Sequence, residues 1–224
     1  MEKFYAYIQI ISLAVFLALF TGKAVYLRRQ KKISAIKINI FTREGLKHVF
    51  EIILFILVNL WTFSLLAYSL KTAFGTFPSL PELKLFNIFG LKIAGLILII
   101  SGFVFYVLAL KNLGNSWRLG IDDKNPGKLV TTGIYSFSRH PIYLFFNLYF
   151  LGTFLINGNL VFIVFTFLLG AVLHWQLIRE EKFLLKVYER QYREYMSSTG
   201  RYFTFKFLIS IKRVKYLFRF EKAE

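Results

Sequence analysis

The chain has 224 residues, of which 56% are hydrophobic and 19% aromatic, and 27 of them are phenylalanine. A soluble domain of this size has no need for so many phenylalanines, whereas segments that span a bilayer explain them. The formal charge is +17, and the chain has no cysteine, which excludes disulfides, thiolate zinc sites and a cysteine nucleophile. We expect no metal site.

Five apolar segments are predicted to be membrane helices, because about twenty apolar residues cover a hydrocarbon core of roughly 30 Å. They are Phe4–Thr21, Val49–Leu70, Phe86–Leu110, Ile142–Ile156 and Leu160–Ile178. The first has no cleavage site of small residues after its apolar run, so it is expected to be a retained helix. The fourth is only about 22 Å long as a helix. Since Asn157-Gly158-Asn159 joins it to the fifth, the two are predicted to form a tight helical hairpin.

The positive charge follows the order of these segments. Lys23–Lys47 contains eight Lys or Arg, Lys71–Leu85 two, Lys111–Pro141 five, the Asn-Gly-Asn turn none, and the tail from Arg179 twelve. This alternation is what the positive-inside rule requires. Topology therefore explains the charge without nucleic-acid binding. It predicts an N-terminus outside the cell, with the basic loops and the tail in the cytoplasm.

We expect one membrane domain over residues 1–224, with three parts. Residues 1–110 carry three spans, and residues 111–203 carry the polar loop, the hairpin and an amphipathic helix from Arg179 to about Ser197. Residues 204–224 form a basic tail. In Thr204–Phe220, phenylalanine, leucine and isoleucine alternate with lysine and arginine, which is typical of a helix that lies on anionic lipid.

Ionisable residues gather before the fourth segment, at a predicted membrane surface. Arg139 and His140 precede Pro141, and Tyr143 follows it. Proline is well tolerated in the first turn of a helix, so this helix is expected to begin at Pro141. Ionisable side chains beside hydrocarbon are expensive to keep, which makes this group a functional-site hypothesis. The alternative is an ordinary interfacial anchor at a helix end.

A second group of polar residues follows the fifth segment. Residues at intervals of three and four place carboxylate, leucine and tyrosine side chains on one face of the predicted helix. These residues are Glu181, Leu184, Leu185, Tyr188, Tyr192 and Tyr195, with Glu180 beside them. Salt bridges and an aromatic belt would account for each residue singly. Carboxylate, phenol, imidazole and guanidinium groups around one cavity can hold a zwitterionic ligand that carries adenosine.

Four motifs occur in order between Leu113 and Phe203. They are Leu-Val-x-x-Gly-x-Tyr at Leu129–Tyr135, Arg-His-Pro-x-Tyr at Arg139–Tyr143, Glu-Glu-x-x-Leu at Glu180–Leu184 and Tyr-x-x-Tyr at Tyr192–Tyr195. Together they resemble the isoprenylcysteine carboxyl methyltransferase family and its phospholipid methyltransferase relatives. The resemblance implies an all-α integral membrane protein of about five transmembrane helices.

The resemblance also implies methyl transfer from S-adenosylmethionine in a cytoplasm-facing pocket beside the hairpin. It implies catalytic roles for Arg139 and Arg201, which would hold and align anionic groups. The cofactor-binding residues that it implies are Leu129, Val130, Tyr135, His140, Tyr143, Glu180, Glu181, Tyr192 and Tyr195. A lipophilic acceptor would enter sideways from the bilayer. The resemblance favours a carboxylate as the acceptor group, and a carboxylate nucleophile would need no general base.

Other readings stay open at this point. The acceptor is equally compatible with a phospholipid amine or another hydrophobic amine or thiol. Nicotinamide-dependent sterol reductases have C-terminal regions similar to this family, although the chain lacks their longer multi-span N-terminal half. A membrane protein without enzymatic activity that keeps the motifs as scaffold is the third class. The sequence does not set the oligomeric state.

Overall fold

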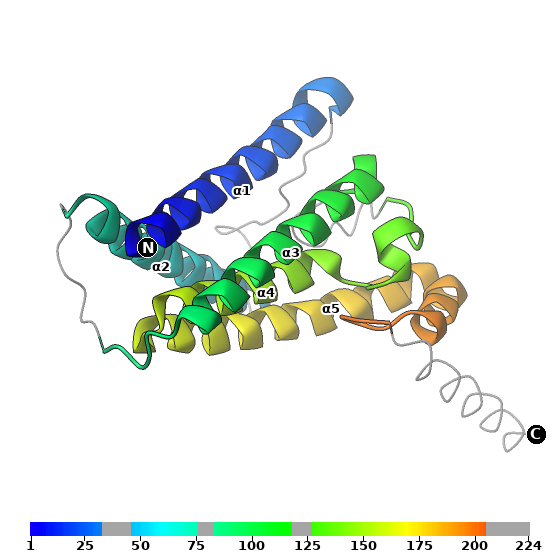
Figure 1. The fold of residues 1–224 in the computed structure, drawn as a ribbon. Helices are drawn as coiled ribbons and strands as arrows, with labels where there is room; N and C mark the ends of the chain where they lie inside the picture. The colour runs from blue at the N-terminus through cyan, green and yellow to red at the C-terminus, as the bar shows by residue number, and fades with distance from the viewer. Residues whose placement is uncertain (33–45, 76–82, 118–126, 205–224) are drawn as a thin grey trace, which may run out of the picture.

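The computed structural model describes residues 1–32, 46–75, 83–117 and 127–204. Within these ranges the chain is helical and has no β-strand (Figure 1). The helices are α1 (Glu2–Lys31), α2 (Leu46–Phe74), α3 (Phe89–Leu113), α4 (Pro141–Asn157) and α5 (Leu160–Ser198), with short 3-10 helices η1 (Gly114–Ser116) and η2 (Gly133–Ser136). Each predicted apolar segment corresponds to one helix, so the all-α membrane fold is confirmed.

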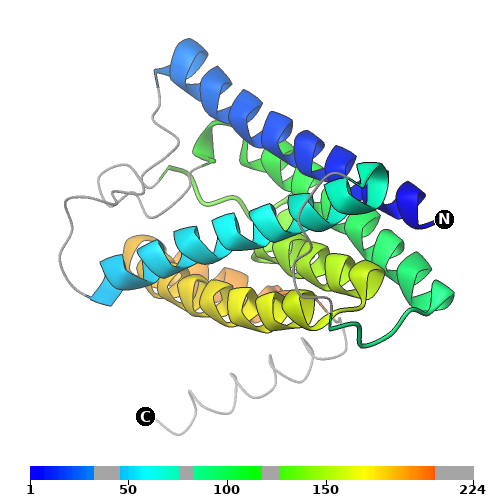
Figure 2. The ribbon, with the colours of Figure 1, turned by 90° about the vertical axis from the view of Figure 1, so that its left-hand side faces the viewer.

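Four of these helices are long and apolar enough to cross a membrane, namely α1, α2, α3 and α5. Helix α4 is shorter, with 17 residues from Pro141 to Asn157. It begins at the proline, as predicted. Because α4 packs on both α3 and α5 (Figure 2), protein rather than lipid covers much of its surface.

A stack of aromatic rings fills the core between α3 and α4. Phe145 is fully buried and stacks on Tyr106 at a centroid distance of 4.6 Å and on Tyr149 at 5.6 Å. Trp61 of α2 meets Tyr149 edge-on at 5.3 Å. Such aromatic pairs contribute packing beyond their buried area, and the stack therefore joins three helices.

The Asn-Gly-Asn turn forms the predicted tight hairpin between α4 and α5. Gly158 adopts a positive φ of 60°, and a Cβ there would lie 2.2 Å from the Phe86 carbonyl oxygen. The Gly158 carbonyl accepts hydrogen bonds from the backbone N–H groups of Leu85 (2.7 Å) and Phe86 (3.2 Å). The turn is thus fastened to the segment that leads into α3.

The prediction of a separate helix that begins at Arg179 is wrong. Helix α5 continues through Arg179 without interruption, because the surrounding residues are good helix formers and no glycine or proline divides them. The break comes later, at Glu189, where φ is 41° and ψ is −109°. Beyond this break the last turns of α5 (orange in Figure 1) leave the axis of the preceding part.

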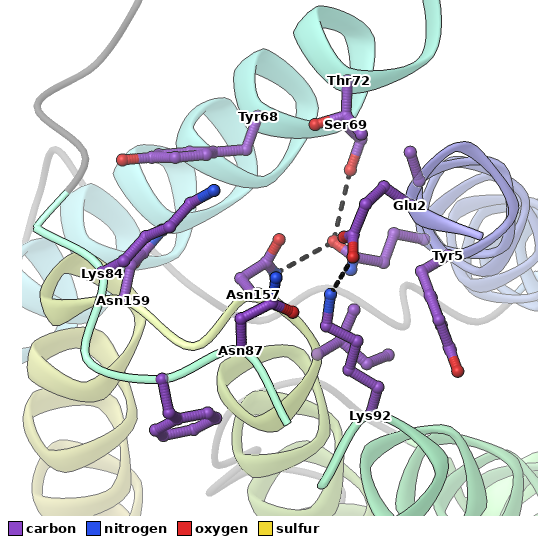
Figure 3. Close-up of a pocket in the computed structure, with 14 residues that line it drawn as sticks. Glu2, Tyr5, Tyr68, Ser69, Thr72, Lys84, Asn87, Lys92, Asn157 and Asn159 are labelled. Carbon is purple, nitrogen blue, oxygen red and sulfur yellow. Dashed lines mark hydrogen bonds and ion pairs between the residues drawn. The ribbon is translucent and has the colours of Figure 1, made fainter. Parts of the chain in front are cut away.

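A polar cavity of about 70 Å³ lies at the end of the bundle that contains the start of α1 and the α4–α5 turn (Figure 3). The polar side chains that line this cavity form hydrogen bonds and an ion pair with one another. The Oε1 atom of Gln9 accepts hydrogen bonds from Ser69 (3.2 Å) and Asn157 (3.1 Å), and Lys92 pairs with Glu2. These bonds tie α1, α2, α3 and the turn together, so we assign the cavity a structural role.

Several sequence predictions fall outside the described residues. The basic tail from residue 205 is one, and parts of the first and third basic loops, at residues 33–45 and 118–126, are others. The division into three parts and the cytoplasmic orientation stay predictions.

Candidate functional site

Three segments that are distant in sequence meet at the end of the bundle opposite the polar cavity. They are the residues before α4, the middle of α5 and the segment that follows α5. The Arg139 N–H donates to the Gly200 carbonyl (3.0 Å), and the Ser138 hydroxyl donates to the Arg201 carbonyl (3.2 Å). Backbone contacts therefore hold the segment after α5 against the start of α4.

Glu181 lies at the centre of this meeting point, with a side chain that is 6% exposed. Its Oε1 accepts from the Nη2 of Arg139, and its Oε2 accepts from the Nη2 of Arg201, each at 2.6 Å. The Nε of Arg201 lies 3.2 Å from both oxygens, and the Nε2 of His140 lies 3.3 Å from Oε1. We call Arg139, His140, Glu181 and Arg201 the Glu181 cluster. A buried carboxylate needs such partners to stay charged.

The two arginines of the cluster are held differently. Arg139 is buried, and its Nη1 also donates to the carbonyls of Met196 (3.2 Å) and Thr199 (3.0 Å). The side chain of Arg201 is 38% exposed, and its described hydrogen bonds all go to Glu181. Arg139 is therefore fixed by the protein backbone, whereas Arg201 depends on one carboxylate.

Glu180 points into a different environment from Glu181. It lies near the half-buried Tyr143 and interacts electrostatically with that phenol and with Tyr135 and Tyr192. Glu181 has its lone pairs occupied by arginine and histidine donors. Of the two carboxylates, Glu180 thus has the fewer described protein partners.

The predicted tyrosines form an apolar group beside these carboxylates. Tyr135, Tyr192 and Tyr195 are buried together with Ala109 of α3, and the Tyr195 hydroxyl donates to the Tyr135 carbonyl at 2.5 Å. The partly buried side chains that pack on this group include Leu129, Val130, Leu184, Leu185, Tyr188 and Met196. The break at Glu189 turns Tyr192 and Tyr195 toward α3, and this gives the group its walls.

The phenols here are neutral hydrogen-bonding groups rather than bases. Burial raises the pKa of Tyr135 well above its ordinary value, and the nearby charge of Glu180 adds to the effect. Burial likewise raises the pKa of Tyr202. Their hydroxyls stay protonated at physiological pH.

Two buried polar atoms beside the carboxylates lack a hydrogen-bond partner in the described part of the chain. They are the Nε of Arg139 and the hydroxyl of Tyr192. A buried polar atom without a partner is costly, and a ligand or a water molecule commonly satisfies it. The arginine N–H and the tyrosine hydroxyl can donate to a carboxylate, and the Glu180 carboxylate can accept from an ammonium group. The three groups together suit a ligand that carries both a carboxylate and an ammonium. These residues therefore fit the amino-acid part of S-adenosylmethionine.

The geometry brings together most of the residues to which the family resemblance assigns a role. Arg139 and Arg201, which are 62 positions apart, share one carboxylate, and His140 joins them. Leu129 and Val130 lie farther out, as walls of the tyrosine group. The roles of these residues in binding or catalysis stay predictions.

Sequence reasoning missed one contact near the Glu181 cluster. The Nδ1 of His174 lies 2.9 Å from the Tyr202 hydroxyl, and their rings stack at 6.0 Å. A signal for it existed, because His174 precedes Glu181 by seven residues and Tyr202 directly follows Arg201. Seven residues make two helical turns, which places His174 and Glu181 on one face of α5.

Comparison with known proteins agrees with the motifs. Residues 91–191 match the family model for phospholipid methyltransferase. The chain is similar to protein-S-isoprenylcysteine O-methyltransferase of Saccharomyces cerevisiae, at 33% identity over 128 residues that cover 54% of this chain and 53% of the relative. It is also similar to probable protein-S-isoprenylcysteine O-methyltransferases of Oryza sativa subspecies indica and japonica, each at 33% identity over 120 residues, 51% of this chain and 61% of the relative.

These matches confirm the resemblance that the motifs indicate. The chain spans about half to three fifths of the length of the curated relatives it matches. The matched range 91–191 includes Arg139, His140, Glu180 and Glu181, whereas Tyr192, Tyr195 and Arg201 lie beyond it.

Proposed function

We propose that the protein is an integral membrane methyltransferase that uses S-adenosylmethionine and modifies a lipophilic acceptor, with a carboxylate as the favoured acceptor group. The observation that carries this proposal is the Glu181 cluster. There the buried carboxylate of Glu181 gathers Arg139 and His140, which lie inside the range matched by the methyltransferase family model, and Arg201, which lies beyond that range. Two buried polar atoms beside it have no described hydrogen-bond partner. The bound cofactor would supply a methyl group on a sulfonium.

The cofactor's amino-acid part would be held by groups whose bonding capacity is still open. Glu180 would pair with the ammonium, and the Nε of Arg139 and the hydroxyl of Tyr192 would donate to the carboxylate. Leu129, Val130 and the Tyr135 ring would line the adenosine region. Glu181 would act as the anchor that keeps both arginines in place.

The acceptor would meet Arg201, which is the more exposed arginine of the cluster. A guanidinium can hold a carboxylate bidentately and so orient it for in-line attack on the methyl carbon. Orientation of this kind supplies much of the acceleration in a two-substrate reaction. A carboxylate is already a nucleophile at physiological pH and needs no general base. This agrees with the protonated phenols of the site, which are not bases.

A phospholipid amine is the second candidate acceptor, because the matching family model is that of phospholipid methyltransferase. Detergent-purified protein incubated with labelled S-adenosylmethionine distinguishes the two. An S-farnesylated N-acetylcysteine should yield a methyl ester that releases its label in base. Phosphatidylethanolamine would instead yield a base-stable N-methyl product.

Tyr192 offers the sharper test of the cofactor site. Its hydroxyl has no described partner, so Tyr192→Phe should leave thermal stability unchanged or higher, yet weaken binding of S-adenosylhomocysteine about tenfold in calorimetry. Tyr195→Phe is the matched comparison, and it should lower stability because it loses the bond to the Tyr135 carbonyl. Wild-type protein that binds NADPH and ignores S-adenosylhomocysteine would refute the proposed function.

A further inference from the structure

The segment after α5 carries two neighbouring side chains that point to different partners. Arg201 contacts Glu181, and Tyr202 contacts His174. On α5, His174 lies two turns before Glu181. Gly200 sits at the bend before them, where an added Cβ would lie 1.9 Å from the Phe203 carbonyl oxygen. The chain therefore folds back on itself tightly enough to present residues 201 and 202 to α5.

The contact between Tyr202 and His174 has the properties of a specific interaction. The Tyr202 hydroxyl lies 2.9 Å from Nδ1 of His174, and the two rings are inclined by only 28°. Both side chains are half-buried. Neither residue belongs to the four motifs.

Arg201 needs external support for its position. Its side chain is 38% exposed, and a long exposed arginine loses rotamer entropy when it is held in one geometry. The backbone of Arg201 has one described hydrogen bond, which its carbonyl oxygen accepts from the Ser138 hydroxyl. The anchored ring of Tyr202 fixes the peptide that follows Arg201 and so restricts the directions its guanidinium can take.

We propose that His174 and Tyr202 are positioning residues that hold Arg201 against Glu181 and aim it at the acceptor. This inference rests on the proposed function in one respect, the identity of the acceptor site. The pair acts through Arg201 and not on the cofactor. Its loss should therefore raise the KM for the acceptor and leave the affinity for S-adenosylhomocysteine within about twofold.

Trypsin cleavage after Arg201 tests the positioning without any need for activity. Proteolysis of a native protein reports the local opening of the segment that is cut. Tyr202→Phe and His174→Leu should each speed cleavage at Arg201 about fivefold, the effect of one lost hydrogen bond. His174→Asn should restore the wild-type rate, because an asparagine side chain can place a polar atom where Nδ1 stood. Cleavage at the exposed Arg193 serves as the internal reference.

The matched control is Tyr149→Phe. It removes a hydroxyl that shares a hydrogen bond with the Ser12 hydroxyl at 2.8 Å, in the aromatic core, and that bond does not involve the segment after α5. This control should change neither cleavage at Arg201 nor the acceptor KM.

Two results would overturn the proposal. One is unchanged cleavage at Arg201 in both Tyr202→Phe and His174→Leu. The other is faster cleavage with an unchanged acceptor KM, which would show that the pair only stabilises the segment after α5 and does not position Arg201 for the acceptor. Should the wild-type protein neither bind S-adenosylhomocysteine nor transfer methyl groups, the proposed function fails, whereas the cleavage rates still decide whether the pair positions Arg201.

Discussion

Arg139 makes contacts that a lysine ammonium cannot reproduce together. Its Nη2 pairs with Glu181, while its Nη1 donates to two carbonyls at the end of α5. Lysine keeps the charge but loses the planar fork. We expect Arg139→Lys to cost about 1.5–3 kcal/mol for each charged hydrogen bond lost. Thermal unfolding in detergent should show the loss, and methyl transfer should fall with it.

Arg190→Lys is the control for this change. Arg190 forms a fully exposed pair with Glu194 on the same helix, at 2.7 Å. Its replacement should leave the unfolding temperature and activity unchanged. Equal stability of the Arg139→Lys and Arg190→Lys proteins would show that Arg139 does not clamp the segments together.

The two adjacent glutamates are expected to behave differently. Glu181→Gln removes the anion shared by two arginines, and breaking a buried ion pair costs about 3–5 kcal/mol. Glu180→Gln keeps the cluster intact, so the fold should survive while S-adenosylhomocysteine binding weakens at least about tenfold. Thermal unfolding and calorimetry on both variants measure the two effects. A stable Glu181→Gln protein that has lost binding, beside normal binding in Glu180→Gln, would reverse the assignment.

At the scale of residues, sequence predicts which side chains gather but not how they share partners. The motifs single out Arg139, Glu180 and Glu181, and the family resemblance adds Arg201. Three of these four residues, Arg139, Glu181 and Arg201, meet directly in the Glu181 cluster. The division of labour between the glutamates depends on side-chain direction, which adjacent positions on a helix do not reveal. The contact between His174 and Tyr202 depends on the bend at Gly200, and only the folded chain contains it.

Helices α3 and α4 approach each other closely at a pair of glycines. A Cβ on Gly95 would lie 2.6 Å from the Gly152 carbonyl oxygen, and one on Gly152 would lie 2.7 Å from the Gly95 carbonyl oxygen. Because backbone atoms block both positions, Gly95→Ala should force the helices apart at a cost of about 1–3 kcal/mol. Thermal unfolding should detect this loss.

Gly90 provides the matched comparison on the same helix, since no atom lies within 4 Å of an added Cβ there. Gly90→Ala should therefore be neutral or slightly stabilising, because alanine favours a helix by about 1 kcal/mol over glycine. If both alanine variants unfold at the same temperature, close packing of α3 on α4 does not depend on Gly95.

At the scale of elements, the apolar segments predict the helices well and their polar ends poorly. Hydropathy detects the lipid-facing stretch, yet α1 runs ten residues beyond Thr21 to Lys31 and α5 twenty beyond Ile178 to Ser198. Polar helix formers continue a helix without an apolar signal. The small residues at helical spacing in α3 predict close helix packing, which occurs at Gly95 and Gly102 but not at Gly90. Whether another helix faces Gly90 depends on the tertiary structure, and the spacing of glycines along α3 does not reveal it.

The whole molecule separates two polar regions along the bundle. The start of α1, the segment before α3 and the α4–α5 turn enclose the polar cavity at one end, and the Glu181 cluster lies at the other. The buried polar bonds at the cavity end connect helices, whereas the cluster end keeps unsatisfied atoms and a partly exposed arginine. This contrast is why we place ligand binding at the cluster.

The orientation of these two ends across the membrane is the last prediction, and it rests on the basic residues of the loops. The chain has no cysteine, so single cysteines can be introduced without background. A cysteine at Lys3, which is exposed at the start of α1, or at Ser79 should react with an impermeant maleimide added to intact cells. A cysteine at Ser34 or at Arg193 should react only after the cells are permeabilised.

Ser34 and Ser79 lie outside the described residues and rest on sequence alone, whereas Lys3 and Arg193 mark opposite ends of the bundle. Labelling of Lys3→Cys and Arg193→Cys from the same side would contradict the arrangement. Labelling of Arg193→Cys from outside, with Lys3→Cys protected, would instead invert it and put the Glu181 cluster on the external face.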